Sequence, residues 1–486
     1  MIEMNLDTQI CDRARLARDP RFDGLFFIGV LSTGIYCRPI CPARSPKAEN
    51  IVYFPSAAAA AEAGFRPCLR CRPEAAPGSP AWNGTSATVS RAVLLIRQGE
   101  LQEQNMEDLA SKLGVTGRHL RRLFQIHIGA SPKTLATTQK ILFAKKLLSE
   151  TDLSVTHIAF ASGFGSIRRF NAAFSKMYGR TPSSVRMRNN ESKITGDELF
   201  RCTLTLSYRP PFDWQRMLEF FELRAIPGVE WVANGAYHRT IRINETTGMI
   251  SVAPSPKGNA LLLTVALSDS RDLMSIVERV RRMFDLDANM AAIHEVLTAD
   301  AVLEKSVRKH PGLRLPGIWD PFEAAVRAVL GQQVSVKGAR TLIGRIVAKT
   351  APRFESPDFR NLTHFFPTAH ELNTRDLGAI GMPESRVRSL QALAEEVDRE
   401  NLFFVVKESL SDFIEKLTRI PGIGDWTAQY IAMRAMGEPD AFPAGDLGIV
   451  KAMRQADKRL TVKEIRQRAE TWRPWRAYAT MYLWHG

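Results

Sequence analysis

Four cysteines between residues 37 and 71 constrain this chain of 486 residues more than any other feature of its sequence. They form two close pairs, Cys37 with Cys41 and Cys68 with Cys71. Loops this short present both sulfur atoms of a pair to a common point, so two pairs can bind one tetrahedral Zn²⁺. Arginines flank both pairs, which indicates a basic surface suited to a polyanion such as DNA. The sequence therefore predicts a small four-cysteine zinc domain at the N-terminal end.

Two alternatives bear on the role of these cysteines. Most four-cysteine zinc sites are closed and purely structural. A disulfide framework is disfavoured, because no signal peptide precedes the segment and the remaining cysteines, Cys11 and Cys202, are isolated. Spacing alone leaves open whether the zinc is structural or takes part in chemistry.

Residues 33–44 and 63–73 resemble the N-terminal domain of Ada, the bacterial adaptive-response methylation regulator. In that family the first cysteine is both a zinc ligand and a sacrificial nucleophile, which takes a methyl group from a methylphosphotriester in DNA. The resemblance implies that Cys37 is the acceptor and that Cys41, Cys68 and Cys71 complete the ligand set. A metal keeps a thiol deprotonated near neutral pH, and the thiolate is the nucleophile. Methylation of Cys37 would also remove a negative charge that faces phosphate, which should tighten DNA binding.

Bulk properties agree with a DNA-directed protein. The formal net charge is +15 and the sequence pI is about 9.7, which favours a polyanionic partner, although a generally basic soluble protein is the alternative. The chain is too long for one core and predicts three or four domains. No apolar run approaches the roughly 20 residues needed to span a bilayer. We therefore expect a soluble protein with no membrane partner.

Two helix pairs, each with a glycine-containing turn, follow the zinc segment. The first pair is expected over residues 106–115 and 116–124, and the second over 155–161 and 166–174. Helix pairs of this kind occur in many α proteins, but here both second helices are basic. The pattern resembles the two-motif DNA-binding domain of AraC-type transcription regulators. If the second helices enter successive major grooves, the contact candidates are Arg118, Arg121, Arg122, Arg168 and Arg169.

A different module begins near residue 200. Short β-rich runs at 204–206, 240–243 and 261–265, with a helical stretch at 214–224, predict a small α+β subdomain, and the pattern after Ser270 is almost wholly helical. Within the helical part, a tight Pro-Gly-Ile-Gly turn at 421–424 separates two helices. Such a turn leaves backbone N–H groups at a helix N-terminus that can hold a DNA phosphate. An ordinary interhelical turn is the alternative.

Residues 200–486 resemble 3-methyladenine DNA glycosylase II (AlkA), of the helix-hairpin-helix superfamily. The matching segments, in order, are residues 208–214, 282–286, 311–317, 329–335 and 472–478. The resemblance implies that the hairpin binds DNA, with a monovalent cation at the turn. The hairpin residues carried over are Pro421, Gly422, Ile423, Gly424 and Thr427.

The family's catalytic carboxylate corresponds to Asp446. An Asp after a Gly at a helix start is commonly an N-cap, and in a glycosylase it does both jobs. The bond between base and C1′ breaks with oxocarbenium character, which a nearby carboxylate stabilises. Superfamily members often have Gly-Pro-Asp at this position, while this chain has Ala444-Gly445-Asp446, which puts the loop geometry in question.

Three aromatic residues, Trp426, Tyr430 and Trp484, occupy the positions that line the family's base pocket, although aromatic residues at helical spacing are more often core. Alkylated purines are cationic, and cation–π contacts contribute about 1–2 kcal/mol each. Trp426 also stands where relatives that cut the backbone have a Schiff-base lysine, so we expect a monofunctional enzyme. The wedge position, leucine in the best-known AlkA sequences, is Gln333 here.

We therefore expect a multidomain, mainly α protein with α+β parts: a four-cysteine zinc domain, an AraC-type double helix-turn-helix, an α+β subdomain and an all-α helix-hairpin-helix glycosylase domain. The expected limits are 1–75 for the zinc domain, 76–87 and 189–198 for linkers, 88–188 for the AraC-type domain, 199–310 for the α+β subdomain with the start of the helical part, and 311–486 for the glycosylase domain.

The expected function is an alkylation-damage response, with excision of alkylated purines, methyl transfer to Cys37 and transcription regulation. The expected partner is double-stranded DNA, at alkylated sites and promoters. We expect a monomer in the bacterial cytoplasm, associated with the nucleoid. One alternative is a DNA-binding regulator whose glycosylase part is a non-catalytic lesion-binding scaffold. Another is a repair enzyme whose zinc and helical modules merely raise DNA affinity.

Overall fold

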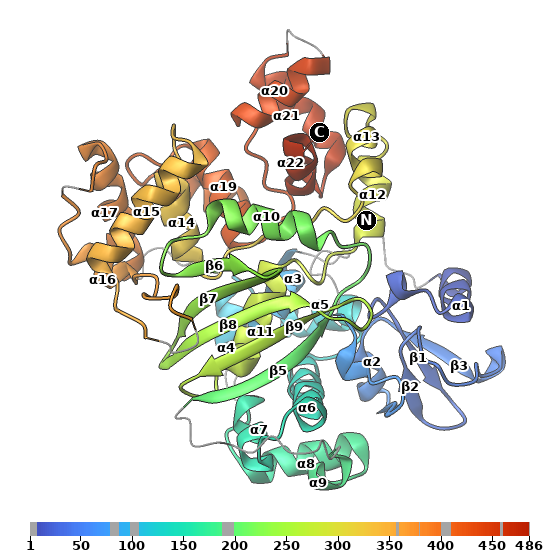
Figure 1. Ribbon diagram of the computed structural model, residues 1–486. Helices are drawn as coiled ribbons and strands as arrows, with labels where there is room; N and C mark the ends of the chain where they lie inside the picture. The colour runs from blue at the N-terminus through green and yellow to red at the C-terminus, as the bar shows by residue number, and fades with distance from the viewer. Residues whose placement is uncertain are drawn as a thin grey trace.

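The computed structural model describes residues 7–77, 87–97, 106–186, 199–355, 359–378, 380–399, 410–456 and 460–485. Most of the expected linker 76–87 and all of the linker 189–198 lie outside these residues. Figure 1 shows a central sheet with the N-terminal domain at its right, a helical group below it and most of the C-terminal helices above it. Within the described part of the chain, no helix is long and apolar enough to cross a membrane.

The N-terminal domain is built on a four-stranded sheet of order β3-β1-β2-β4. Strand β1 is antiparallel to β2 and β3, whereas β2 and β4 are parallel. The elements are α1 (Thr8–Ala17), η1 (Pro20–Phe22), β1 (Phe27–Val30), β2 (Ile35–Cys37), η2 (Ala48–Asn50), β3 (Ile51–Phe54), α2 (Ala57–Glu62), β4 (Arg66–Pro67) and η3 (Pro73–Ala75). The two cysteine pairs therefore follow adjacent, parallel strands, which brings both pairs to one end of the sheet.

The next region consists of helices, with both helix-turn-helix pairs at the expected places. The helices are α3 (Ala87–Arg97), α4 (Met106–Lys112), α5 (Gly117–Ile128), α6 (Pro132–Glu150), α7 (Val155–Ala161), α8 (Ile167–Tyr178) and α9 (Pro182–Val185). The turns contain Gly114 and Gly163 at positive φ, a conformation that other residues rarely adopt. Helices α5 and α8 run four residues beyond their expected ends, to left-handed caps at Gly129 and Gly179.

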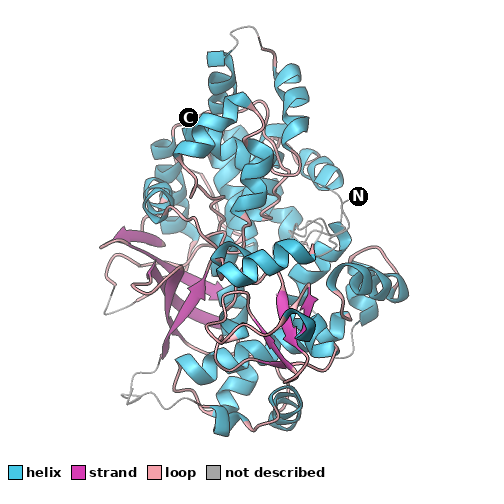
Figure 2. Ribbon diagram, turned by 90° about the vertical axis from the view of Figure 1, so that its right-hand side faces the viewer, coloured by secondary structure: helices cyan, strands magenta, loops and turns pink. Residues whose placement is uncertain are grey.

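The α+β subdomain is an antiparallel five-stranded sheet of order β5-β9-β8-β7-β6. Figure 2 shows its strands apart from those of the N-terminal domain. The elements are β5 (Phe200–Ser207), α10 (Trp214–Arg224), β6 (Glu230–Ala233), β7 (Ala236–Ile243), β8 (Thr246–Pro254) and β9 (Ala260–Leu267). The three expected β-rich runs lie in β5, β7 and β9, and the expected helix is α10.

The described residues beyond Ser270 form helices and loops, apart from isolated bridges. The helices are α11 (Leu273–Met283), α12 (Met290–Leu297), α13 (Ala301–Lys309), α14 (Pro321–Leu330), α15 (Val336–Thr350), α16 (Ala369–Asn373), α17 (Glu384–Asp398), α18 (Leu410–Thr418), α19 (Asp425–Ala435), α20 (Leu447–Ala456), α21 (Val462–Arg468), η4 (Ala469–Trp472) and α22 (Arg476–His485). One core runs through these helices, from α12 to α22.

A buried ion network fixes α14 against the sheet. Glu323 of α14 is fully buried and accepts hydrogen bonds from Arg239 of β7 (2.8 Å) and from Arg327 (2.6 Å). Arg327 also pairs with Glu230 of β6 at 2.5 Å. Because α14 leads into the loop that carries Gln333, this network sets the position of that loop relative to the sheet.

The second helix-turn-helix motif and the α+β subdomain share one hydrophobic core. Buried side chains of α6, α7 and α8, among them Leu147, Ile158 and Phe170, belong to the same cluster as Leu206 of β5 and Tyr237 of β7. The second helix-turn-helix motif therefore packs as part of the C-terminal half.

Glu150, at the end of α6, joins three parts of the molecule. Its carboxylate accepts hydrogen bonds from the Thr205 backbone N of β5 (2.8 Å), from Lys146 (3.0 Å) and from Arg72 of the N-terminal domain (3.3 Å). A second link runs through Asp23, whose carbonyl oxygen accepts a hydrogen bond of 2.9 Å from the fully buried Arg209. The N-terminal domain is thus docked on both following regions.

Candidate active site and zinc centre

The four expected cysteines lie together. The Sγ atoms of Cys37, Cys41, Cys68 and Cys71 all lie within 4.8 Å of one another. Tetrahedral zinc–thiolate geometry places sulfur atoms about 3.8 Å apart, so the cluster fits one Zn²⁺. Hydrogen bonding to Cys41 and Cys68, together with burial, raises the pKa of the Cys37 thiol well above its ordinary value. Thiols this close cannot all ionise without a cation, so the donor set itself fits a metal.

The four clustered cysteines differ in exposure. Cys68 and Cys71 are buried, whereas Cys37 and Cys41 are partly exposed. Cys37 ends β2 and is paired with Ile28 of β1, which holds its backbone in a fixed strand. A large substrate could therefore approach Cys37 while the second pair stays covered.

The arginines around the cysteines divide into two groups. Arg66 and Arg70 are exposed, as expected of a basic surface. Arg38 is buried: its guanidinium pairs with the carboxylate of Asp23 and donates a hydrogen bond of 3.0 Å to the Cys71 carbonyl oxygen. Arg72 pairs with Glu74 and Glu150. Arg38 and Arg72 therefore serve mainly to bind neighbouring segments together, because acidic partners lie beside them in the fold.

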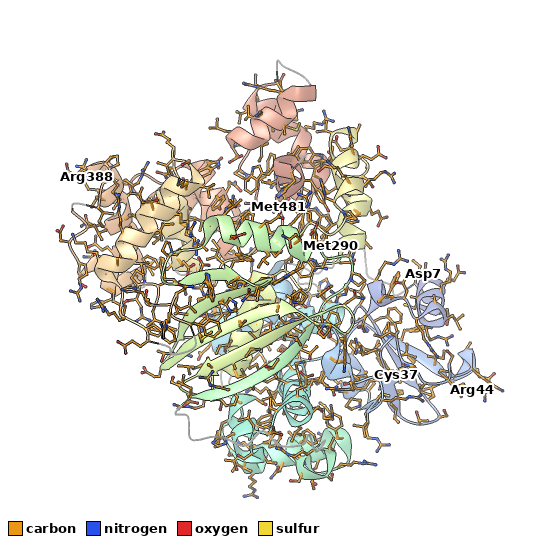
Figure 3. The ribbon with its side chains drawn as sticks, in the orientation of Figure 1. Asp7, Cys37, Arg44, Met290, Arg388 and Met481 are labelled. Carbon is orange, nitrogen blue, oxygen red and sulfur yellow. The ribbon has the colours of Figure 1, made fainter. Side chains whose placement is uncertain are left out.

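A second candidate site is a cleft of about 1180 Å³ among α14, α15, α19, α20 and α22. The expected catalytic, pocket and wedge residues all line it: Asp446, Trp426, Tyr430, Trp484 and Gln333. Figure 3 shows Cys37 well apart from Met481 of α22, so the zinc centre and this cleft are separate sites.

The carboxylate of Asp446 is held from both sides. Its Oδ1 accepts a hydrogen bond from Trp484 Nε1 at 2.9 Å, and its Oδ2 accepts one from Trp426 Nε1 at 3.0 Å. Oδ1 also accepts from the backbone N–H groups of Gly448 and Ile449, so Asp446 caps α20 as its position suggested. The carboxylate is half-buried, with its orientation fixed by four donors.

Trp426 and Tyr430, one turn apart on α19, stack with ring centroids 5.5 Å apart and an interplanar angle of 22°. Next along the same face, Arg434 is buried, and its guanidinium lies 4.5 Å from the ring centre of Phe220. Burial lowers the pKa of Arg434 to about 10. The cleft thus offers aromatic faces above a buried positive charge.

The expected hairpin joins α18 to α19. Gly422 has φ +82°, and a Cβ there would lie 2.0 Å from Ser389 Oγ, so the turn requires glycine. Gly424 is the N-cap of α19, whose first N–H groups lack intrahelical acceptors. The side-chain amide of Gln332 donates to the Gly422 carbonyl and to Thr427 Oγ1, both at 2.9 Å. The loop between α14 and α15 (residues 331–335), called the wedge loop here because it carries Gln333, is therefore hydrogen-bonded to the hairpin.

Gln333 itself is exposed and has φ +54°, a conformation that costs a non-glycine residue about 1–3 kcal/mol. The carbonyl oxygen of Gln332 accepts a hydrogen bond of 2.7 Å from Arg386, which helps to hold the strained loop. Gln333 is therefore an exposed residue at the cleft, as a wedge requires.

Three families of known domains match the chain in order. The metal-binding domain of Ada matches residues 10–74, a helix-turn-helix domain matches 109–188 and the AlkA N-terminal domain matches 203–320. A probable bifunctional transcriptional activator/DNA repair enzyme AlkA of Mycobacterium tuberculosis is 42% identical over 484 residues, which span 99% of this chain and 97% of that protein. This chain belongs to the same family. The expected fusion of Ada-type, AraC-type and AlkA-type parts is confirmed.

Two further similarities concern the AlkA-type part of this bifunctional family member. DNA-3-methyladenine glycosylase 2 of Escherichia coli is 34% identical over 284 residues, which cover 58% of this chain and 96% of that protein. The solved structure of a 3-methyladenine DNA-glycosylase from Archaeoglobus fulgidus superposes with a TM-score of 0.51 at 20% identity, over 58% of this chain and 96% of that one. This second match shows the shared glycosylase fold.

In the AraC-type part, the expected contact arginines lie on the exposed faces of α5 and α8: Arg118, Arg121, Arg122, Arg168 and Arg169. Their buried neighbours on the same helices, such as Leu120 and Phe170, face the core. Arg121 forms an exposed ion pair with Glu107, with 3.7 Å between Nη2 of the arginine and Oε1 of the glutamate.

Sequence reasoning missed several residues of the cleft in this AlkA family member. Gln332 joins the wedge loop to the hairpin by a hydrogen bond. Arg434 and Phe220 contact each other and both line the cleft. Gly448 lies against the ring of Trp484. These residues come from distant segments and form no local motif. The spacing of Arg434 after Tyr430 was the one available signal.

Proposed function

We propose that this protein is a bifunctional alkylation-response protein with the domain limits expected from the sequence. Its C-terminal half is a monofunctional DNA glycosylase that excises alkylated purines of the 3-methyladenine type from duplex DNA. Its N-terminal half accepts a methyl group from a methylphosphotriester in a single turnover and regulates transcription. The observation that carries the proposal is the carboxylate of Asp446, held between the indoles of Trp426 and Trp484 in an aromatic cleft.

In the glycosylase step, the flipped nucleotide enters the cleft with its C1′ facing Asp446. The bond between C1′ and the base nitrogen breaks, and the base departs with the electron pair. Positive charge then develops on the sugar, and the fixed carboxylate stabilises it. Because four donors already orient the carboxylate, little reorganisation is needed in the transition state. Water adds to C1′ and loses a proton to the solvent, which leaves an abasic site.

The pocket favours electron-poor bases. Trp426 and Tyr430 present a stacked pair of rings from α19, and Trp484 approaches from α22. A cationic alkylpurine stacks on such faces more strongly than an undamaged base, because the ring quadrupole attracts positive charge. Trp426 cannot form an imine, so the backbone is left uncut.

The hairpin and the wedge loop act together on the DNA. The N–H groups around Gly422 and Gly424, with Pro421, Ile423 and Thr427, hold a phosphate without reading its sequence. The same turn would hold a monovalent cation, whose positive charge would favour that phosphate. Gln333 fills the space left by the flipped base, and its amide offers hydrogen bonds to the orphaned partner base.

At the other end of the molecule, Cys37, Cys41, Cys68 and Cys71 would hold one zinc ion, which when bound keeps the sulfur atoms as thiolates. The Cys37 sulfur attacks the methyl carbon of the methylphosphotriester. The C–S bond forms as the C–O bond breaks, and the phosphodiester leaves with the electron pair. The thioether is stable, so the reaction ends after one turnover.

Methylated Cys37 carries no negative charge, so it no longer repels phosphate, and the AraC-type part binds promoter DNA more tightly. Exposed arginines of α5 and α8 then contact successive major grooves. The protein acts as a monomer on double-stranded DNA.

The test is incubation with duplex DNA treated with a methylating agent, with four readouts. We expect free methylpurines, abasic sites without strand breaks, and no covalent adduct after borohydride reduction. Mass spectrometry of the same sample should place one methyl group on Cys37. Tight DNA binding without base release would favour a regulator with a non-catalytic lesion-binding scaffold, and a methyl group elsewhere or nowhere would contradict the acceptor role.

A further inference from the structure

An unusually exposed leucine stands beside the candidate catalytic carboxylate. Leu447 follows Asp446 directly and begins α20, and its side chain is 86% exposed, more than that of any other large apolar residue in the described part of the chain. A single exposed leucine is ordinary on a protein surface. Leu447 differs from the other exposed leucines of the described residues because it lines the cleft; the others are Leu16, Leu31, Leu69 and Leu223.

Helix α20 fixes the direction of this side chain. Ile449 and Met453, which lie one turn apart, are fully buried and pack into the core of the helical part. Leu447 and Lys451 lie one turn apart on the opposite face, both are exposed and both line the cleft. This face therefore presents an apolar side chain at the site with a positive charge beside it.

The opposing wall of the cleft supplies a polar wedge. Gln333 comes from the loop between α14 and α15, and Figure 1 shows α15 and α20 well apart. An amide can hydrogen-bond to an orphaned base, but it brings little apolar contact to replace the stacking lost on flipping. Proteins that open a base step commonly insert an apolar side chain such as leucine into the minor groove.

We propose that Leu447 is a second insertion residue, which enters the minor groove of lesion-containing DNA and packs against the base pair beside the flipped nucleotide. Lys451 then contacts the phosphate alongside. The inference rests on the proposed glycosylase function, since it assumes that DNA approaches Asp446.

The first test is binding to a duplex that contains a tetrahydrofuran abasic-site analogue, with 2-aminopurine as the neighbouring base. Leu447→Ala should weaken this binding about tenfold, the effect of losing most of a buried leucine side chain, and leave binding to undamaged duplex within about twofold of wild type. It should also abolish the change in 2-aminopurine fluorescence that wild type produces. Leu447→Phe should restore both.

Leu223→Ala is the matched control, because Leu223 is 63% exposed on α10 and does not line the cleft. Both leucines are exposed, so neither alanine variant should alter folding. If Leu447→Ala behaves like Leu223→Ala with the abasic duplex, the insertion role is wrong. This readout needs no base release, so failure of wild type to release methylpurines would contradict the glycosylase proposal separately.

Discussion

The indole Nε1 of Trp484 lies 2.9 Å from Oδ1 of Asp446, so the last helix of the chain orients a carboxylate on α20. The approach depends on Gly448, where a Cβ would lie 2.8 Å from Cδ1 of the same indole. Trp484, a residue of the expected base pocket, therefore also orients the candidate catalytic carboxylate of Asp446.

Replacing Trp484 with Phe should keep an aromatic face and remove the hydrogen bond. A hydrogen bond to a charged group contributes about 1.5 kcal/mol, so we expect kcat for base release to fall about tenfold. Single-turnover kinetics on methylated duplex DNA would measure this. Trp472→Phe is the control: its Nε1 donates to Asp300 at 2.8 Å, remote from the cleft, so it should lower stability and spare kcat. Equal kcat values in both variants would contradict the orienting role.

The amide of Gln332 should matter for DNA binding. Gln332→Met keeps the length of the side chain but loses both hydrogen bonds to the hairpin, so the wedge loop and the hairpin would move independently. Each bond is worth about 1 kcal/mol, so loss of both should lower affinity for abasic duplex by up to about thirtyfold. Fluorescence anisotropy would measure it, with Gln215→Met, on the exposed face of α10, as the control. Unchanged affinity would show that the tie is dispensable.

The zinc prediction separates the clustered cysteines from an isolated one. Cys71→Ser should lose the bound metal, because three thiolates form an incomplete site, and it should lower the melting temperature of the N-terminal domain. Burial raises the pKa of Cys202 to about 12, so its thiol stays protonated and does not bind the metal. Cys202→Ser should therefore keep one zinc ion per chain. Metal analysis after gel filtration would measure the zinc content of both variants. Zinc retained in Cys71→Ser would contradict the proposal that all four clustered cysteines bind the metal.

The buried network at Glu323 predicts a pH-dependent stability. Burial alone would raise the pKa of Glu323, but Arg239 and Arg327 lower it below the ordinary 4.5. Its contribution is therefore fully present above pH 4.5 and is lost as the pH falls through the lowered pKa. Glu323→Gln should lose about 3 kcal/mol at neutral pH, because the buried Arg239 and Arg327 then share Glu230 as their remaining charge partner.

Thermal unfolding between pH 3 and pH 7 would measure both effects. Glu304→Gln is the control, since Glu304 forms an exposed pair with Arg308. The difference between wild type and Glu323→Gln should shrink at the acid end of the range. A stability difference between wild type and Glu323→Gln that grows as the pH falls would contradict the lowered pKa of Glu323.

Much of this arrangement could be predicted from the sequence, and the reason differs between parts. Local motifs contain Cys37, the helix-turn-helix arginines and Asp446, so spacing and resemblance are enough to single out these residues. Arg38 belongs to such a motif too, yet its burial depends on Asp23, which the motif does not contain. The tie between Gln332 and Gly422 joins segments 90 residues apart, so no periodicity reports it.

The docking of the N-terminal domain is a further case. Glu150 looks like an ordinary acidic helix end in the sequence, but in the fold it contacts Arg72 and the backbone of Thr205. The core shared by α8 and the five-stranded sheet was equally hidden, because the expected linker suggested separate domains. Such contacts depend on the tertiary arrangement of whole elements.

The most direct measurement is release of methylpurines from methylated duplex DNA by wild type and by Asp446→Asn. Asparagine keeps the side-chain oxygen that caps α20 but removes the charge that stabilises the sugar cation. We expect base release to fall at least about 100-fold, while affinity for duplex with an abasic-site analogue is kept. Release by Asp446→Asn at the wild-type rate would contradict the assignment of Asp446 as the catalytic carboxylate.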